Sequence, residues 1–272
     1  MSCIIRGIGN ARTDQNVGTS YVQVKKYSFI LCKDIVLLIL FFCAGKCMVA
    51  QQTDSLVKSD NSTFTIQLNQ DNTFGFFPMI FGSIGLKKAD LTFYAIFWTT
   101  PVFANVDGSG SLIETGMGVG FSAGNWYINP SLGFTHGIFT SGRDQSGRGR
   151  PTIAEAIVPG AIVFFRNEKL ESEFFAAYYQ NLRKEISPQI NYLFVWWLPG
   201  FKFNKYFSSG LHYEQFRDIS TGIALYTRYG LYGKTTFKEK YELRLSVGLN
   251  YSPEGDTKKQ GDFYKLTVNI PF

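Results

Sequence analysis

Alternation of apolar and polar residues is the dominant pattern of the chain from about residue 62 to its end. In the clearest segment, 241–251, every second side chain is apolar, and the residues between them are polar, charged or glycine. Residues 264–272 repeat the same scheme up to the last residue. Because successive side chains of a strand point to opposite faces, this pattern predicts β-strands with one apolar and one polar face.

The pattern predicts about twelve strands, each about nine to fourteen residues long, and no helix longer than a turn or two. The predicted strands cover residues 62–70, 73–86, 90–100, 113–121, 126–134, 153–166, 170–180, 188–199, 206–216, 223–231, 241–251 and 264–272. Pro78 lies inside the second segment and predicts a bend or a bulge there, because proline has no N–H to give to a sheet.

The predicted connections differ in length in a regular way. The short turns are 87–89, 123–125 and 167–169, and the long, polar, glycine-rich loops are 101–111, 136–152, 181–187 and 252–261. Asp71-Asn72 and the stretch 217–220 break the rule, because both are short where a long loop is expected. Short turns at one end and long loops at the other are typical of an up-and-down barrel in an outer membrane.

The predicted fold class is all-β: a transmembrane up-and-down antiparallel β-barrel of about twelve strands, with ten or fourteen as the alternatives. A soluble barrel places its apolar faces inside, whereas a membrane barrel places them against lipid. Lipid is favoured because the apolar faces carry almost no charge and because tyrosines and tryptophans lie at strand ends. The membrane-interface aromatics expected are Trp98 at the outer rim, Trp126, Trp196 and Trp197 at the inner rim, and Tyr241, Tyr251 and Tyr264.

The first fifty residues have the order of a secretory signal peptide. Lys25 and Lys26 precede an apolar run at 35–44, and uncharged residues ending in Ala50 follow. The apolar run is about half as long as a membrane-spanning helix needs to be. Cleavage after Ala50 is therefore expected, and an uncleaved membrane anchor is the alternative. The predicted organisation is a signal peptide at 1–50, a short periplasmic segment at 51–61 and a barrel at 62–272. Residues 1–24 show no pattern of their own and are consistent with a misassigned start.

Composition changes the picture once this segment is set aside. All four cysteines lie in it, so the remaining chain has no disulfide or thiol chemistry. Six Lys or Arg and two acids there supply most of the formal net charge of +6. The remainder is nearly neutral, which excludes a nucleic-acid-binding protein, and 17% aromatic against 18% charged residues excludes a disordered chain.

The last segment carries a resemblance to a known class. Alternate residues form an apolar row that ends on the terminal aromatic: Tyr264, Leu266, Val268, Ile270 and Phe272. This row resembles the C-terminal signal of Gram-negative outer-membrane proteins, although Pro271 departs from the pattern. The stretches 74–86, 93–101 and 129–137 resemble small bacterial barrels of unknown function. The resemblance implies a bacterial outer-membrane location and recognition by the barrel-assembly machinery, and it implies no activity.

Charged residues on the polar faces are the candidates for lining a lumen or pore. These candidates are Glu114, Glu155, Glu173, His212, Glu214, Arg228, Glu242, Arg244 and Lys265. They could form a ladder that selects solutes, or salt bridges that stabilise the wall. Loop 136–152 adds Arg143, Arg148 and Arg150, which could form an anion-favouring constriction, touch lipopolysaccharide or remain in solvent.

The function expected is a passive channel for small solutes. A structural or adhesion barrel with a plugged lumen and a lipid-modifying hydrolase are the alternatives. Ser208, His212 and Glu214 share one strand face, but a serine four residues from a histidine is about 13 Å away, beyond hydrogen-bond reach. No catalytic site is therefore predicted. No metal or cofactor site is predicted either, because two isolated histidines and no cysteine after residue 50 give no ligand cluster. The partners expected are the bilayer, lipopolysaccharide, the assembly machinery and a small solute, with no nucleic acid.

Overall fold

The computed structural model describes residues 62–98, 112–140, 152–183, 190–238, 240–252 and 259–272. The predicted signal peptide at 1–50 and the segment 51–61 lie outside the described residues. The described residues form β1 (Thr63–Asp71), β2 (Gly75–Gly85), β3 (Asp90–Trp98), β4 (Leu112–Ala123), β5 (Trp126–Gly137), β6 (Thr152–Arg166), β7 (Leu170–Asn181), β8 (Tyr192–Lys202), β9 (Phe207–Asp218), β10 (Ala224–Phe237), β11 (Tyr241–Ser252) and β12 (Lys259–Pro271). Among these residues, no helix is long and apolar enough to cross a membrane.

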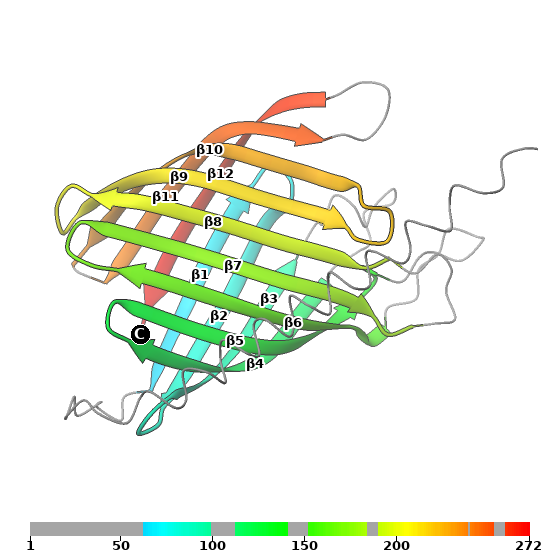
Figure 1. The fold of residues 1–272 in the computed structure, drawn as a ribbon, viewed down its shortest axis with the longest axis horizontal. Coiled ribbons are helices and arrows are strands. Elements are labelled where there is room, and N and C mark those ends of the chain that lie inside the picture. Colours follow the sequence, from blue (N-terminus) through cyan, green and yellow to red (C-terminus); the bar gives the residue numbers. More distant parts are fainter. Residues whose placement is uncertain (1–61, 99–111, 141–151, 184–189, 239, 253–258) are drawn as a thin grey trace, which may run out of the picture. The chain divides into compact units, whose positions relative to one another are not determined.

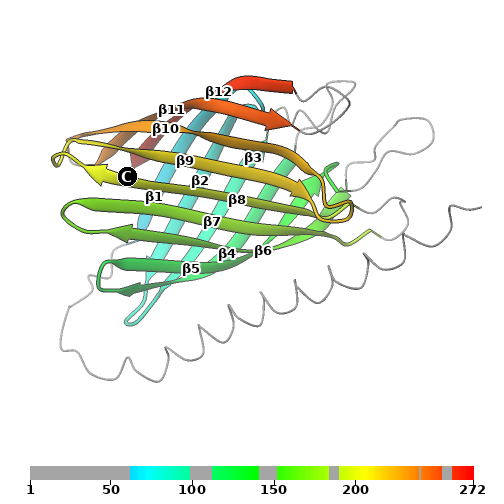
Figure 2. The ribbon, with the colours of Figure 1, turned by 45° about the horizontal axis from the view of Figure 1, so that its top comes forward.

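The strands close into one barrel in chain order (Figures 1 and 2). Each strand pairs antiparallel with its neighbours in sequence, and β1 pairs with β12 to complete the ring, from Thr65 opposite Pro271 to Asp71 opposite Lys265. Closure leaves no strand with an unpaired edge, which is the condition for a sheet in an apolar medium. The predicted all-β class, the up-and-down order and the count of twelve strands are confirmed.

Two local expectations differ from the structure. Of the bend or bulge predicted at Pro78, the bulge is wrong, because the β1–β2 register runs through Pro78 without a shift. The β2–β3 pairing begins only at Met79, opposite Ile96, so the missing N–H of Pro78 costs no bond to β3. Strand β10 continues to Phe237, beyond the predicted end at 231. The prediction ended too early because Gly233 and the threonines after it interrupt the apolar alternation, although these residues still pair with β11.

The two ends of the barrel carry different connections. At one end, short turns join β2 to β3, β4 to β5, β6 to β7, β8 to β9 and β10 to β11 (Figure 1). Asn167 and Asn204 each close such a turn, because their side-chain oxygens accept two successive backbone N–H groups. At the other end, the connections 72–74 and 219–223 are short, and the predicted loops 101–111 and 136–152 lie largely outside the described residues.

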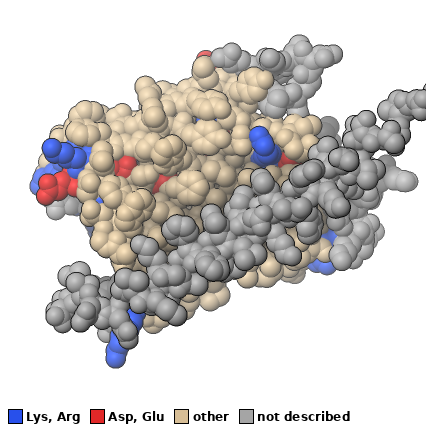
Figure 3. Space-filling view, in the orientation of Figure 1, with Lys and Arg blue, Asp and Glu red and all other residues tan. Residues whose placement is uncertain are grey.

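The outer wall is apolar over most of its height. On β11 the exposed side chains are Leu243, Leu245, Val247 and Leu249, and the other strands follow the same alternation. In the face shown in Figure 3, most of the middle of the wall carries neither Lys or Arg nor Asp or Glu. An apolar surface of this extent is unfavourable in water and suits a lipid environment.

Glycines on the inner wall allow large side chains to lie flat against it. Gly116 on β4 and Gly133 on β5 are direct cross-strand neighbours, and the ring of Tyr94 covers both. A side chain at either position would collide with that ring. The glycines therefore let Tyr94 reach across two strands into the interior.

Candidate functional site: the filled interior

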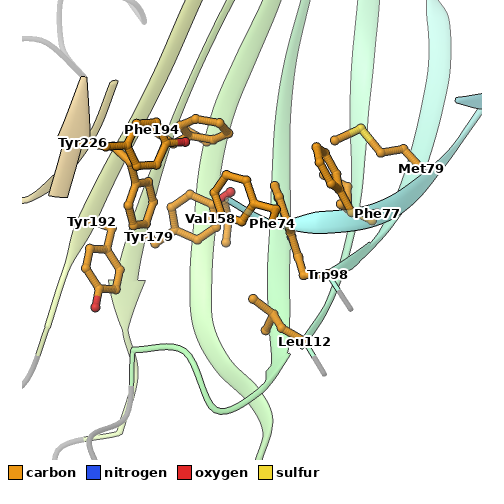
Figure 4. Close-up of a cluster of buried hydrophobic side chains, with 13 residues drawn as sticks. Phe74, Phe77, Met79, Trp98, Leu112, Val158, Tyr179, Tyr192, Phe194 and Tyr226 are labelled. Carbon is orange, nitrogen blue, oxygen red and sulfur yellow. The ribbon is translucent and has the colours of Figure 1, made fainter. Parts of the chain in front are cut away.

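An aromatic cluster fills the interior toward the end with the predicted long loops (Figure 4). Most of its members are buried wall residues, and two come from connections between strands. We define this aromatic plug as Phe74, Phe77, Trp98, Phe139, Tyr179, Tyr192, Phe194, Phe216 and Tyr226. The cavity left among these rings measures about 10 Å³, which is room for about one water molecule.

Phe74 joins walls that lie far apart around the barrel. Its ring centroid is 4.8 Å from that of Trp98 on β3 and 6.5 Å from that of Phe194 on β8. It is also 6.0 Å from the ring centroid of Tyr226 on β10. Since β8 lies opposite β2 in the closed order, these contacts cross the interior and close it at this level.

A buried carboxylate holds Phe74 in this position. One oxygen of Asp71 accepts the backbone N–H groups of Thr73 and Phe74 at 2.7 and 2.5 Å. An aspartate that accepts bonds from the residues two and three positions later fixes a tight turn. The short connection 72–74 therefore directs its aromatic ring into the barrel.

A network of charges lies next to the plug. Arg228 contacts Asp71 at 3.0 Å and Glu214 at 2.9 Å and donates to the Thr73 hydroxyl, and its side chain is fully buried. Lys265 contacts Glu214 at 2.9 Å. We call Asp71, His212, Glu214, Arg228 and Lys265 the central network. It joins β1, β9, β10 and β12, so one group of ion pairs ties four strands together.

A second network lies toward the short turns. Glu171 contacts Lys234 at 2.6 Å, and Glu173 contacts Arg244 at 2.8 Å. Glu242 lies 3.6 Å from Lys234. We call these five residues the lower network. The cavity beside them measures about 20 Å³, again room for about one water molecule.

Two further buried carboxylates accept neutral donors. Glu114 lies between the hydroxyls of Tyr94 and Tyr179, which donate to it at 3.0 and 2.9 Å. Among the described residues, no cation lies within ion-pair distance of Glu114. Glu155 accepts the backbone N–H groups of Phe139 and Thr140 at 2.6 and 2.7 Å. This contact holds Phe139, and with it a second ring, inside the plug.

The structure places the predicted lumen residues inside the barrel. Those on the strand faces that point inward are Glu114, Glu173, His212, Glu214, Arg228, Glu242, Arg244 and Lys265, and Glu155 reaches the interior at a register shift in the β5–β6 pairing. Whether these residues line a conducting path stays a prediction. Arg143, Arg148 and Arg150 lie outside the described residues.

The predicted interface aromatics divide into two groups. Trp126 and Trp197 face outward, each with 49% of its surface exposed, and Tyr251 and Tyr264 are also exposed, whereas Tyr241 is half-buried. The expectation for Trp98 and Trp196 is wrong. Trp98 is only 6% exposed within the plug. The indole of Trp196 stacks on Phe175 at 4.0 Å and donates to Glu173 at 2.9 Å. Neighbouring residues on a strand face opposite sides, so Trp196 and Trp197 cannot both face the membrane.

The terminal row lies in the last strand up to Ile270, and Phe272 directly follows the end of β12. Tyr264 and Leu266 face outward, and the Phe272 N–H donates to the carbonyl of Phe64 at 2.8 Å. Its recognition by an assembly machinery stays a prediction.

Sequence reasoning missed several interior groups. Asp71, Glu171 and Lys234 belong to the two networks, and none of them stands in a regular charged row. One feature of the sequence could have singled out Asp71. It lies beside a short connection at the end of the barrel where a long loop was expected. Sequence reasoning also missed the plug, because its rings come from eight separate segments that meet only on closure.

Ser208 and His212 do not form a catalytic pair in the described part of the interior. The Ser208 hydroxyl donates to Glu171 at 2.7 Å, whereas His212 has its Nε2 atom 3.5 Å from Glu214. No hydrogen bond joins Ser208 to His212. His136 bonds to the Thr115 hydroxyl on the outer face. Within the described part of the chain, no group of three or more His, Cys, Asp or Glu residues is placed to hold a metal ion.

Fold and interior together define a closed twelve-stranded antiparallel barrel with an apolar outer wall and a filled, charge-bearing interior. The chain belongs to a family described as "Family of unknown function (DUF6733)", whose model matches residues 30–272. A comparison with curated proteins gives no match.

Several solved structures are similar to the chain. The KdgM porin is 10% identical, with 76% of this chain and 99% of that chain covered and a TM-score of 0.46. The NanC porin is 9% identical, with coverages of 76% and 98% and a TM-score of 0.45. The outer membrane channel DcaP of Acinetobacter baumannii is 9% identical, with coverages of 82% and 68% and a TM-score of 0.41. Identities near one tenth and TM-scores below 0.5 establish no functional relationship.

Proposed function

We propose that this chain is an outer-membrane barrel that forms a narrow channel for small solutes, and that the aromatic plug closes the channel in this conformation. The outer-membrane location is supported by the apolar outer wall, the signal-peptide pattern and the aromatic terminal strand. The charged lower and central networks give the interior the polar lining that a solute path needs.

The observation that carries the proposal is the origin of the rings in the plug. Phe74 and Phe139 come from the connections 72–74 and 138–140, and both are packed among wall aromatics. The backbone of a connection can move without breaking the strand pairing of the barrel, whereas the backbone of a wall residue cannot. The plug is therefore built partly from elements that can leave the lumen.

Conductance of the purified protein in planar bilayers tests the proposal. Phe74→Ala removes the ring that crosses the interior, and we expect larger or more frequent conductance steps than in the wild type. Phe76→Ala is the matched control, because Phe76 lies two residues away on the outer face and is 47% exposed. Silent bilayers for Phe74→Ala, with the barrel shown to be folded by heat-modifiable migration, would overturn the channel.

A permanently filled structural barrel is the second candidate. It is favoured by Arg228, whose ion pairs to Asp71 and Glu214 link strands across the interior. In that case neither the wild type nor Phe74→Ala conducts, and the ion pairs contribute only to stability.

We propose no hydrolase activity for the interior, because Ser208 and His212 contact different carboxylates. An ester hydrolysis assay checks this: activity that disappears in His212→Ala would restore the hydrolase alternative.

A further inference from the structure

The end of the barrel with the short turns carries a ring of basic side chains. We define this basic rim as the exposed residues Lys87, Lys88, Lys169, Lys205, Lys238 and Lys240. The acids in or beside these turns, apart from the carboxylates of the interior networks, are Asp90, Glu168 and, in sequence between Lys238 and Lys240, Glu239. In Figure 3 blue side chains gather at the end where Figure 1 shows short turns. The rim therefore has a clear positive excess.

Exposed aromatic side chains accompany the basic residues. Phe203, Tyr206 and Phe237 are all exposed in or beside the same turns. The Lys205 and Lys240 amines each lie 4.9 Å from the ring centroid of the tyrosine that follows in sequence. Aromatic rings next to lysine amines are typical of the level where lipid head groups meet the apolar bilayer.

The rim runs around the barrel and does not form one compact patch. Its basic residues come from the turns after β2, β6, β8 and β10, which are spaced around the closed order of strands. A folded acidic partner would contact one side of such a ring. A lipid leaflet surrounds the whole circumference and contacts every turn.

We infer that the basic rim binds the head groups of anionic phospholipids in the leaflet next to the short turns. The positive excess is complementary to phosphate groups that carry net negative charge, and attraction of this kind acts within about one Debye length of the surface. This inference rests on the proposed membrane location of the barrel.

Refolding of the full mature chain into two kinds of vesicle tests the inference. One kind contains phosphatidylcholine alone, and the other has a third of it replaced by phosphatidylglycerol. Heat-modifiable electrophoresis gives the unfolding midpoint in each. We expect phosphatidylglycerol to raise the wild-type midpoint by about 3 °C or more, and about 0.5 M salt to remove most of that rise.

Two paired substitutions locate the effect. Lys87→Gln with Lys88→Gln lowers the rim charge, and we expect it to reduce the phosphatidylglycerol-dependent rise. Arg183→Gln with Arg217→Gln removes two basic side chains near the other end of the barrel and leaves the rise unchanged. Lys87→Arg with Lys88→Arg keeps the charge and the rise, which separates charge from loss of folding.

Each outcome has one meaning. A barrel that inserts into neither vesicle overturns the proposed membrane function. A barrel that inserts into both with the same midpoint overturns the lipid inference alone. If the rim pair and the control pair reduce the phosphatidylglycerol-dependent rise equally, the lipid inference is also overturned. The attraction would then come from the net charge of the whole chain and not from the rim.

Discussion

Arg228 on β10 and Asp71 at the end of β1 form an ion pair of 3.0 Å in which both side chains are fully buried. Strands β11 and β12 lie between the two residues in the wall. The same Asp71 fixes the turn that carries Phe74, and Arg228 also donates to Thr73 in that turn. The ion pair thus ties the turn 72–74 to β10 and holds the ring of Phe74 in the plug.

Loss of this arginine should destabilise the barrel. Arg228→Ala leaves two buried carboxylates, Asp71 and Glu214, without a shared cation, and we expect a loss of about 3–5 kcal/mol in the free energy of unfolding. The urea midpoint of refolded protein measures it. Arg217→Ala is the control, because Arg217 lies on the outward-facing side of β9. Equal midpoints for Arg228→Ala and the wild type would contradict the role of the pair.

Charge should matter differently for two interior glutamates, Glu114 and Glu173. Glu114 bonds only to tyrosine hydroxyls, so Glu114→Gln keeps an acceptor for one hydroxyl and a donor to the other. We expect a change of less than about 1 kcal/mol. Glu173→Gln removes the carboxylate that pairs with the part-buried Arg244, and we expect a loss of about 2–4 kcal/mol. Chemical unfolding of both variants measures the difference, and a larger loss for Glu114→Gln would reverse the assignment.

The glycines beneath Tyr94 provide a separate test of the interior. Gly116→Ala places a methyl group against the Tyr94 ring and should displace that ring from Glu114, with a loss of about 1–3 kcal/mol. Gly233→Ala is the matched control, because no atom lies near the position that its new methyl group would take. The unfolding midpoints of the two variants decide the point, and equal midpoints would show that Tyr94 is not held against the wall.

Sequence periodicity was sufficient for the strand count and the closure, because most strands keep one apolar face. It was insufficient where both faces are apolar. On β8, Phe194, Trp196 and Leu198 face inward while Val195 and Trp197 face outward, so no polar row marks the interior. The aromatic plug removes the contrast on which the prediction depended.

The pairing of the interior charges could not be predicted for a different reason. Glu214, Arg228 and Lys265 each belong to a predicted polar face. Their contacts depend on the stagger of β9, β10 and β12 around the closed ring and on the inward turn after β1. A single strand pattern contains no information on that stagger.

The four tryptophans allow a direct test of which wall faces lipid. Trp126 and Trp197 are 49% exposed on the outer face, whereas Trp98 is 6% exposed and Trp196 donates to Glu173 on the inner face. In variants that keep one tryptophan each, with phenylalanine at the other three positions, brominated lipids should quench Trp126 and Trp197 strongly and the two interior indoles weakly, because bromine quenches on contact. Heat-modifiable migration of each variant confirms that the barrel is closed. Strong quenching of Trp98 in a closed barrel would mean that its ring reaches the lipid, and the plug would then lack one of its walls.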